Sequence, residues 1–135
     1  MLEDGRGVPH SNEALRWIKK AADQGLSFAQ FHLGLMIESG IGVEQSSREA
    51  AYWFRKAADQ GHAMAQLTLG IAFKCGRGMA PNDFEATRWI KKASDHGFAQ
   101  VQRHLGVMYS MGSGVAQSDE KAVRLFKNAA MQGDV

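Results

Sequence analysis

Apolar residues recur along the chain at the spacing of one helix face, and two kinds of face alternate. The first kind has apolar residues at i, i+3, i+4 and i+7, as in Ala50, Trp53, Phe54 and Ala57. The second kind has them at i, i+4 and i+8, as in Ala65, Leu69 and Phe73. Residues three or four apart share one side of an α-helix, and no segment shows the period of two expected of a strand. The pattern therefore predicts an all-α chain.

Both faces return every 36 residues. The segment Ala21–Gly25 recurs, with small changes, at 57–61, 93–97 and 129–133. The same step relates Leu33-Gly34 to Leu69-Gly70 and Leu105-Gly106, and Trp17 to Trp53 and Trp89. This period predicts one domain, 1–135, built from a partial repeat at 1–25 and full repeats at 26–61, 62–97 and 98–133. Each full repeat consists of a leading helix followed by a trailing helix.

Capping residues and glycines mark the ends of the predicted helices. Ser46 with Glu49 has the spacing of a capping box at a helix start. Gly61 and its repeat equivalents are suited to left-handed caps at helix ends. Gly34, Gly70 and Gly106 fall inside leading helices, where glycine costs about 1 kcal/mol relative to alanine. We therefore expect a neighbouring helix to approach closely at these positions.

The repeat resembles the Sel-1-like repeat, a relative of the tetratricopeptide repeat. The residues that carry the resemblance in one unit are Ala65, Leu69-Gly70, Phe73, Gly76-Arg77-Gly78, Ala86, Trp89, Lys92-Ala93 and Gly97. The departures are Val101, Leu125, Asn128 and Ser94. The resemblance covers essentially the whole chain and implies a right-handed α-α superhelix, a solenoid, of bacterial origin. Helicobacter-type members have a cysteine pair in each repeat, so their disulfides and claimed penicillin binding are not carried over to this chain.

Composition narrows the class of partner. The chain has 16 basic and 14 acidic residues, and a net charge of +2 is too small to indicate nucleic acid. No apolar run approaches the ~20 residues of a membrane span, and the N-terminus does not resemble a signal peptide. A single cysteine, Cys75, excludes a disulfide framework. We expect a cytoplasmic protein, with a periplasmic or secreted one as the alternative if a signal has been removed.

Candidate catalytic motifs have a structural explanation. Ser118 and Lys121 match the S-x-x-K motif of β-lactam-recognising enzymes, but Ser118 is the repeat equivalent of the capping residue Ser46. The glycine pairs Gly40/Gly42, Gly76/Gly78 and Gly112/Gly114 follow helices instead of strands, so they are interpreted as hairpin loops and not phosphate loops. Cys75, at a helix C-terminus, is interpreted as an inert thiol. The sequence thus predicts no catalytic residue.

The histidines do not form a metal-ligand pattern. They are His10, His32, His62, His96 and His104, and they fall in different repeats or at repeat boundaries. A zinc ion needs three or four ligands within about 2.3 Å of one point. We therefore expect no metal and no cofactor.

The leading helices supply a candidate protein-binding groove. By analogy with tetratricopeptide repeats, the concave side should carry the residues two before, two after and five after the recurrent leucine. These are Phe31, Leu35, Glu38, Leu67, Ile71, Lys74, Arg103, Val107 and Ser110, flanked by Phe28, Met64 and Met111. Apolar residues edged by charges suit an apolar or amphipathic peptide. The alternative is that the same residues pack against helices of a tightly wound solenoid.

The resemblance implies a non-catalytic protein–protein interaction module, an adaptor or scaffold for a protein or peptide segment. A sharper form is a module that neutralises or chaperones a bacterial effector. The alternatives are β-lactam hydrolase-like activity and a structural spacer in a longer array. The first trailing helix presents Trp17 and Ile18 with no leading helix before it, which indicates a fragment of a longer array or an end covered by a partner or by self-association. Of these, the fragment is the preferred interpretation.

Overall fold

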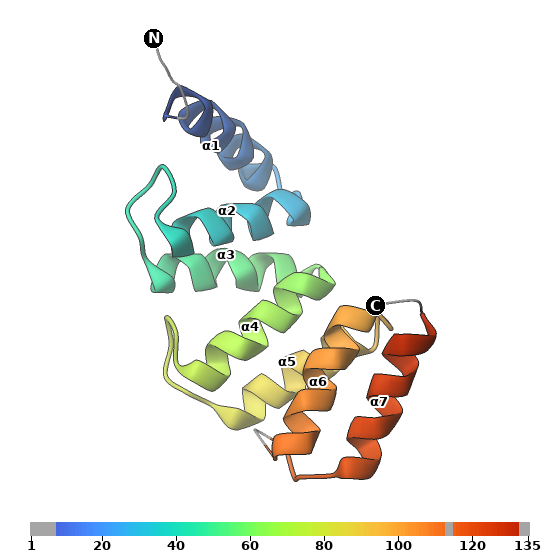
Figure 1. Cartoon of the computed structure of the whole chain (residues 1–135). Coiled ribbons are helices and arrows are strands. Elements are labelled where there is room, and N and C mark those ends of the chain that lie inside the picture. The colour runs from blue at the N-terminus through green and yellow to red at the C-terminus, as the bar shows by residue number, and fades with distance from the viewer. Residues whose placement is uncertain (1–7, 113–114, 133–135) are drawn as a thin grey trace.

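The computed structural model describes residues 8–112 and 115–132, and this part of the chain consists of helices and connecting turns without a strand (Figure 1). The helices are α1 (Val8–Asp23), α2 (Ser27–Ser39), α3 (Ser47–Asp59), α4 (Ala63–Cys75), α5 (Asp83–Ser94), α6 (Ala99–Met111) and α7 (Asp119–Met131). The predicted all-α class is confirmed. Helices α2, α4 and α6 are the leading helices, and α1, α3, α5 and α7 are the trailing helices.

Each helix packs mainly against its neighbours in sequence. The leading helices α2, α4 and α6 lie along the trailing helices that follow them, and the pairs stack from α1 at the top of Figure 1 to α7 at the lower right. Contacts between consecutive pairs are formed by α1 with α2, α3 with α4 and, less extensively, α5 with α6. This serial packing is typical of a helical repeat superhelix, in which each unit contacts only the next.

The glycines inside the leading helices are sites of close helix approach, as the sequence predicts. A Cβ atom added to Gly70 would lie 2.6 Å from Cγ1 of Ile90 on α5, and one added to Gly34 would lie 2.6 Å from Cε1 of Phe54 on α3. Gly106 has the same relation to Phe126 on α7, at 2.8 Å. The absence of a side chain at these positions therefore allows each leading helix to pack closely against its trailing helix.

The predicted capping residues begin the trailing helices α3, α5 and α7. The backbone N–H of Glu49 donates to Oγ of Ser46 at 3.1 Å, and that of Glu85 donates to Oδ1 of Asn82 at 2.9 Å. At the ends of the leading helices, Gly40, Gly76 and Gly112 adopt left-handed conformations with φ near 70°. The predicted positions at Gly5, Gly7, His10, Gly114 and Gly133 lie outside the residues, or the side chains, that the structure describes.

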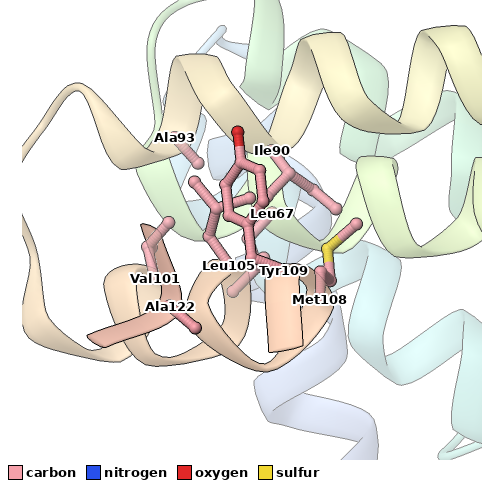
Figure 2. Packing of buried hydrophobic residues seen from close by; sticks show 8 residues of the cluster. All are labelled: Leu67, Ile90, Ala93, Val101, Leu105, Met108, Tyr109 and Ala122. Atoms are coloured by element: carbon pink, nitrogen blue, oxygen red, sulfur yellow. The ribbon is translucent and has the colours of Figure 1, made fainter. Parts of the chain in front are cut away.

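Small and branched apolar residues fill the interior between helices. In the cluster of Figure 2, Ile90 and Ala93 from α5 and Val101, Leu105 and Tyr109 from α6 surround a side chain from α4; the cluster members are Leu67, Ile90, Ala93, Val101, Leu105, Met108, Tyr109 and Ala122. Further clusters join α1, α2 and α3, and α3, α4 and α5. The core is thus continuous along the array, with each interface shared by adjacent units.

One buried polar residue recurs in every leading helix. Gln30, Gln66 and Gln102 are all less than 10% exposed. The Gln30 side chain accepts from Nε2 of Gln60 at 2.7 Å and donates to the carbonyl of Ala22 at 3.2 Å. It therefore links a leading helix to the trailing helices on both sides.

Candidate functional site

The groove prediction places residues two positions before the recurrent leucine on the solvent side, and this is wrong for Leu67. Leu67 is 2% exposed and belongs to the core cluster beside Val101 and Leu105 (Figure 2). Its equivalent Phe31 is half-buried, with ring centroids 5.9 Å from Phe54 and 4.9 Å from His62. Both side chains insert between the next trailing and leading helices. The alternative stated above, packing inside the solenoid, therefore holds at these two positions.

The solvent side of the leading helices is formed by a different set of positions. A helix advances 100° per residue, so the side opposite the glycine that faces the trailing helix includes the residue two positions before it. In each leading helix, this residue and its neighbours about one turn before and after it form the side that faces away from the trailing helix. We call these residues together the leading-helix face; they are Phe28, His32, Leu35, Met64, Thr68, Ile71, Gln100, His104 and Val107. All of these residues are exposed or half-buried. Phe28 is 67% exposed and Val107 is 46% exposed, so apolar surface lies at both ends of this face.

Three of the nine predicted groove residues, Leu35, Ile71 and Val107, therefore lie on the leading-helix face. His32, Thr68, Gln100 and His104 on this face are not among the predicted groove residues, and Phe28 and Met64 are predicted only to flank them. The glycine after the recurrent leucine is the signal that could have identified them, because it fixes which side of the helix is covered.

The polar residues of the predicted groove, Glu38, Lys74, Arg103 and Ser110, lie in two kinds of surroundings, half-buried and exposed. Glu38 is half-buried; its Oε2 accepts from Oγ of Ser47 at 3.2 Å and lies 3.7 Å from Nε of Arg77. Lys74 is half-buried, whereas Arg103 and Ser110 are exposed. Glu38 thus connects the first residue of α3 with the loop that follows α4, and Arg103 is an exposed cationic residue at the α6 end of the face.

Histidine and phenylalanine rings cluster at the α2 end of the face. His32 lies edge-on to Phe28, with centroids 4.4 Å apart. His62 caps α4, since its Nδ1 accepts from the backbone N–H of Ala65 at 3.1 Å. Burial lowers the pKa of His62, and the nearby His32 and His96 lower it further. Burial, followed by the charge of Arg103, also lowers the pKa of His104. These shifts favour the neutral rings in the folded protein.

An open apolar pocket of about 480 Å³ lies between α1 and α2. It is lined by Trp17, Ile18, Ala21, Leu26, Ser27, Phe28, Ala29 and His32. Trp17 is 58% exposed, although its equivalent Trp89 is 3% exposed. A smaller pocket of about 280 Å³ lies at the other end of the leading-helix face and is lined by Gln100, Arg103, His104, Val107 and Phe126. Apolar surface is therefore available at both ends of the array.

The candidate catalytic motif has a structural role. Oγ of Ser118 accepts from the backbone N–H of Lys121 at 3.2 Å, as expected for an N-cap, and Nζ of Lys121 lies 5.3 Å from the ring centre of Tyr109. The Gly40/Gly42 and Gly76/Gly78 pairs form left-handed turns between paired helices. Cys75 is an exposed free thiol at the end of α4. These contacts assign the serine and glycines to helix boundaries.

Within residues 8–112 and 115–132, no three His, Cys, Asp or Glu side chains come together as metal ligands. The helices described there are too short or too polar for any of them to cross a membrane.

Comparison with known families gives four consecutive matches to one model. The Sel1 repeat model matches residues 1–26, 27–62, 63–98 and 99–134. These matches begin one residue later than the predicted repeat boundaries from the second unit on. A search of curated proteins gives no match.

Solved structures of similar sequence share the architecture. A Sel1 repeat protein from Oxalobacter formigenes is 38% identical, with a TM-score of 0.81 over 91% of this chain and 49% of that protein. The protein c5321, described as a protective antigen present in uropathogenic Escherichia coli strains and displaying an SLR fold, is 37% identical, with a TM-score of 0.83 over 91% of this chain and 26% of its own. This chain thus spans about half and about a quarter of these two relatives.

A more distant structure agrees in fold alone. Helicobacter pylori cysteine rich protein B is 19% identical, with a TM-score of 0.69 over 96% of this chain and 92% of that protein. The shared architecture does not depend on the cysteines of that protein, since this chain has only one.

Proposed function

The chain belongs to the Sel1 repeat family, and we propose that it is a non-catalytic protein-interaction module whose leading-helix face binds an apolar or amphipathic segment of a partner protein. Sel1 repeat proteins generally mediate protein interactions and are typically scaffolds. The observation that carries the proposal is the apolar surface of the leading-helix face, which is exposed at Phe28 and Leu35 on α2 and at Val107 on α6. Between them, on α4, Met64 and Ile71 are half-buried.

The composition of this face favours a peptide ligand. Aromatic and aliphatic groups at Phe28 and Leu35 supply apolar contact area, while Gln100 and His104 supply hydrogen-bonding groups further along. A mixture of apolar anchors and a polar rim is the usual anatomy of an interface between proteins. The exposed positive charge of Arg103 at the α6 end favours an acidic group at that end of the bound segment.

We further propose that the partner is a bacterial effector that the module neutralises or chaperones; the bacterial sources of the similar structures support a bacterial setting. The protein works in the cytoplasm, where a free exposed thiol such as Cys75 is maintained in reduced form.

The test compares capture of partners by two matched variants. Leu35→Asp with Val107→Asp places two charges on the leading-helix face, and Tyr52→Asp with Val123→Asp places two charges at exposed apolar positions of trailing helices. Circular dichroism establishes that both variants are folded. Affinity capture from bacterial cells, with quantitative mass spectrometry, should show a partner retained by the wild type and the trailing-helix variant and reduced at least about tenfold by the leading-helix variant. Equal capture by all three proteins would refute the assignment of this face.

A further inference from the structure

Three cationic side chains from two trailing helices gather around one buried ring. The ring is that of Trp89 on α5, which is 3% exposed. The guanidinium carbon of Arg55 on α3 lies 5.4 Å from the ring centre, that of Arg88 lies 5.3 Å from it, and Nζ of Lys92 lies 5.1 Å from it. Any two of these charges therefore lie within about 11 Å of each other. This is comparable with the Debye length of about 10 Å at 0.1 M ionic strength, so their fields add.

Neighbouring carboxylates balance only part of this positive charge. Nε of Arg55 lies 3.6 Å from Oδ1 of Asp59, and Nη2 of Arg88 donates to Oε1 of Glu85 at 2.9 Å. Both arginine side chains remain open to solvent, with exposed fractions of 50% and 40%. Lys92 is exposed and forms no ion pair with any residue in the described ranges 8–112 and 115–132. The surface between α3 and α5 is therefore locally cationic, although the whole chain has a net charge of only +2.

The three cations belong to a row of basic residues that crosses the trailing helices. We name its interior part the trailing-helix belt; it consists of Arg55 and Lys56 on α3 and Arg88, Lys91 and Lys92 on α5. Helices α1 and α7 also have basic residues at the equivalent positions. Because cations of α3 and α5 meet at one ring, the trailing-helix belt is continuous between these two helices.

Helix dipoles account for only part of this arrangement. A cation stabilises the last turn of a helix, and the effect falls off within that turn. Lys91 and Lys92 lie in the last turn of α5, but Arg88 lies six residues before its end, and Arg55 reaches over from α3. Contact with the indole ring holds these groups in place through cation–π attraction. A preorganised cluster of exposed cations is suited to an anionic partner.

Rows of carboxylates border the trailing-helix belt and limit its width. Asp59 and Asp95 follow the basic positions of the two helices, and Glu49 and Glu85 precede them. From the first to the last basic position of α5 the helix advances about 6 Å, which is close to the spacing of about 5 Å between extended strands. A DNA duplex, whose major groove alone is about 12 Å wide, would place phosphates over the bordering carboxylates. The width therefore favours a single extended chain.

The covered rings favour a polypeptide over single-stranded nucleic acid. Bases of a single strand bind by stacking on aromatic rings. Trp89 is 3% exposed beneath the cations. Next to the trailing-helix belt on α3, Nζ of Lys56 lies 5.3 Å from the ring centre of Tyr52, and the ring of Trp53 lies edge-on to it at 5.2 Å. These contacts leave little ring surface for a base, whereas carboxylates need only the cations.

We propose that the trailing-helix belt binds an acidic segment of a partner polypeptide, which lies in extended form across α3 and α5. Carboxylates of the segment pair with Arg55, Arg88 and Lys92, and the guanidinium groups offer two parallel hydrogen bonds each. The trailing-helix belt is separate from the leading-helix face, which lies on α2, α4 and α6. Both α3 and α5 have described helices on either side of them, so this surface does not depend on what adjoins the ends of the array.

The probe is a fluorescein-labelled peptide of four Glu-Ser repeats. In an extended chain alternate side chains point to the same side, so all its glutamates can face the trailing-helix belt together. Titration with the 135-residue chain in about 50 mM sodium chloride should give saturable fluorescence anisotropy. The dissociation constant should rise at least about fivefold in about 200 mM salt, because screening weakens exposed charge pairs. A Gln-Ser peptide of the same length should not bind.

Matched protein variants identify the site. Arg55→Gln with Lys92→Gln removes two charges from the trailing-helix belt and should weaken binding of the Glu-Ser peptide at least about tenfold. Lys74→Gln with Arg77→Gln also removes one lysine and one arginine, outside the trailing-helix belt, and should change binding less than about twofold. Circular dichroism establishes that both variants are folded. Arg55→Lys with Lys92→Arg keeps both charges and should bind the peptide within about threefold of the wild type.

A further variant separates this proposal from the proposed function. Leu35→Ser with Val107→Ser changes the leading-helix face without changing the net charge. This variant should bind the Glu-Ser peptide as the wild type does. Loss of one binding activity therefore leaves the other testable.

Three results would overturn the proposal. The Glu-Ser peptide could fail to bind the folded wild-type chain. The Arg55→Gln, Lys92→Gln variant and the Lys74→Gln, Arg77→Gln variant could lose affinity equally, which would indicate general attraction to cations and no site. A labelled oligothymidylate or vesicles of anionic lipid could bind the wild-type chain as tightly as the peptide and depend on the same two residues, which would make the trailing-helix belt a surface for nucleic acid or membrane.

Discussion

The second full repeat contains a buried hydrogen-bond acceptor that is left without a donor, and His96→Gln should supply one. The amide nitrogen of Gln66 donates to the carbonyl of Ala58 at 3.2 Å, but its Oε1 is buried and accepts no hydrogen bond from the described part of the chain. In the two other full repeats the acceptor is satisfied by a glutamine 30 residues later, Gln60 for Gln30 at 2.7 Å and Gln132 for Gln102 at 2.9 Å. Position 96 holds histidine, whose ring stacks on Phe98 with centroids 5.9 Å apart.

The size of the effect follows from two opposing terms. A buried polar atom without a partner costs about 1–3 kcal/mol, and pairing it recovers a net 0.5–1.5 kcal/mol or more, by general estimates. Removing the stacked ring of His96, which is exposed, loses about 0.5 kcal/mol. We therefore expect His96→Gln to raise the free energy of unfolding by about 1 kcal/mol. For a chain of 135 residues this corresponds to a rise in Tm of about 3–5 °C.

The assay is denaturation by guanidinium chloride and by heat, followed by circular dichroism at 222 nm. A double-mutant cycle tests the cause, because Gln66→Met removes the acceptor while keeping a side chain of similar length. In the Gln66→Met background, His96→Gln should give no gain in stability. The reasoning is refuted if the gain is absent in the wild-type background, or if it persists when the acceptor has been removed.

Three further predictions concern pH, capping and the loops. Because burial lowers the pKa of His62 in the folded chain from its ordinary 6.5, the unfolded chain takes up the proton first, so the urea midpoint should fall as pH drops below about 6.5. His62→Asn keeps a capping group and should make this dependence shallower, leaving the part that the lowered pKa of His104 contributes. Ser118→Ala removes the side-chain cap of α7 and should lower the free energy of unfolding by about 1 kcal/mol. Neither the wild-type chain nor this variant should hydrolyse nitrocefin, and hydrolysis that requires Ser118 would support the enzyme alternative. Gly78→Ala should destabilise by at least about 2 kcal/mol in chemical denaturation, since its Cβ would collide with the carbonyl oxygen of Ser47 at a φ of +86°. At Gly25, where nothing lies within 4 Å of an added Cβ, alanine should cost only about 1 kcal/mol, and equal losses at the two glycines would contradict the collision.

The sequence was sufficient to predict the helices because their boundaries are set by local chemistry. Ser46, Asn82 and Ser118 provide side-chain caps, and the left-handed glycines end the leading helices at fixed positions in each repeat. The 36-residue period made each of these signals independently visible several times. The close helix approach at Gly34 was predictable for the same reason, since a recurring unfavourable residue in a helix implies a packing requirement.

The candidate surface was harder to predict because it depends on rotation about the helix axis. Leu67 and Ile71 are four residues apart and look equivalent in sequence, yet Leu67 is buried in the next junction and Ile71 is half-buried. The orientation is decided by contacts between repeats, which a position count within one helix does not contain. The histidine at position 96 illustrates the same limit, because the glutamines at the equivalent positions 60 and 132 bond to Gln30 and Gln102, which lie 30 residues earlier in the chain.

The tryptophans at 36-residue intervals form a graded series of environments. Trp17 is 58% exposed, Trp53 is half-buried and Trp89 is 3% exposed, although all three occupy the same position in their repeats. Since indole emission shifts with solvent contact, the native protein contains one red-shifted, one intermediate and one blue-shifted emitter, ordered along the array. Single-tryptophan versions, with phenylalanine at the other two positions, would therefore report the unfolding of the first three units separately and show whether these units melt together or from one end.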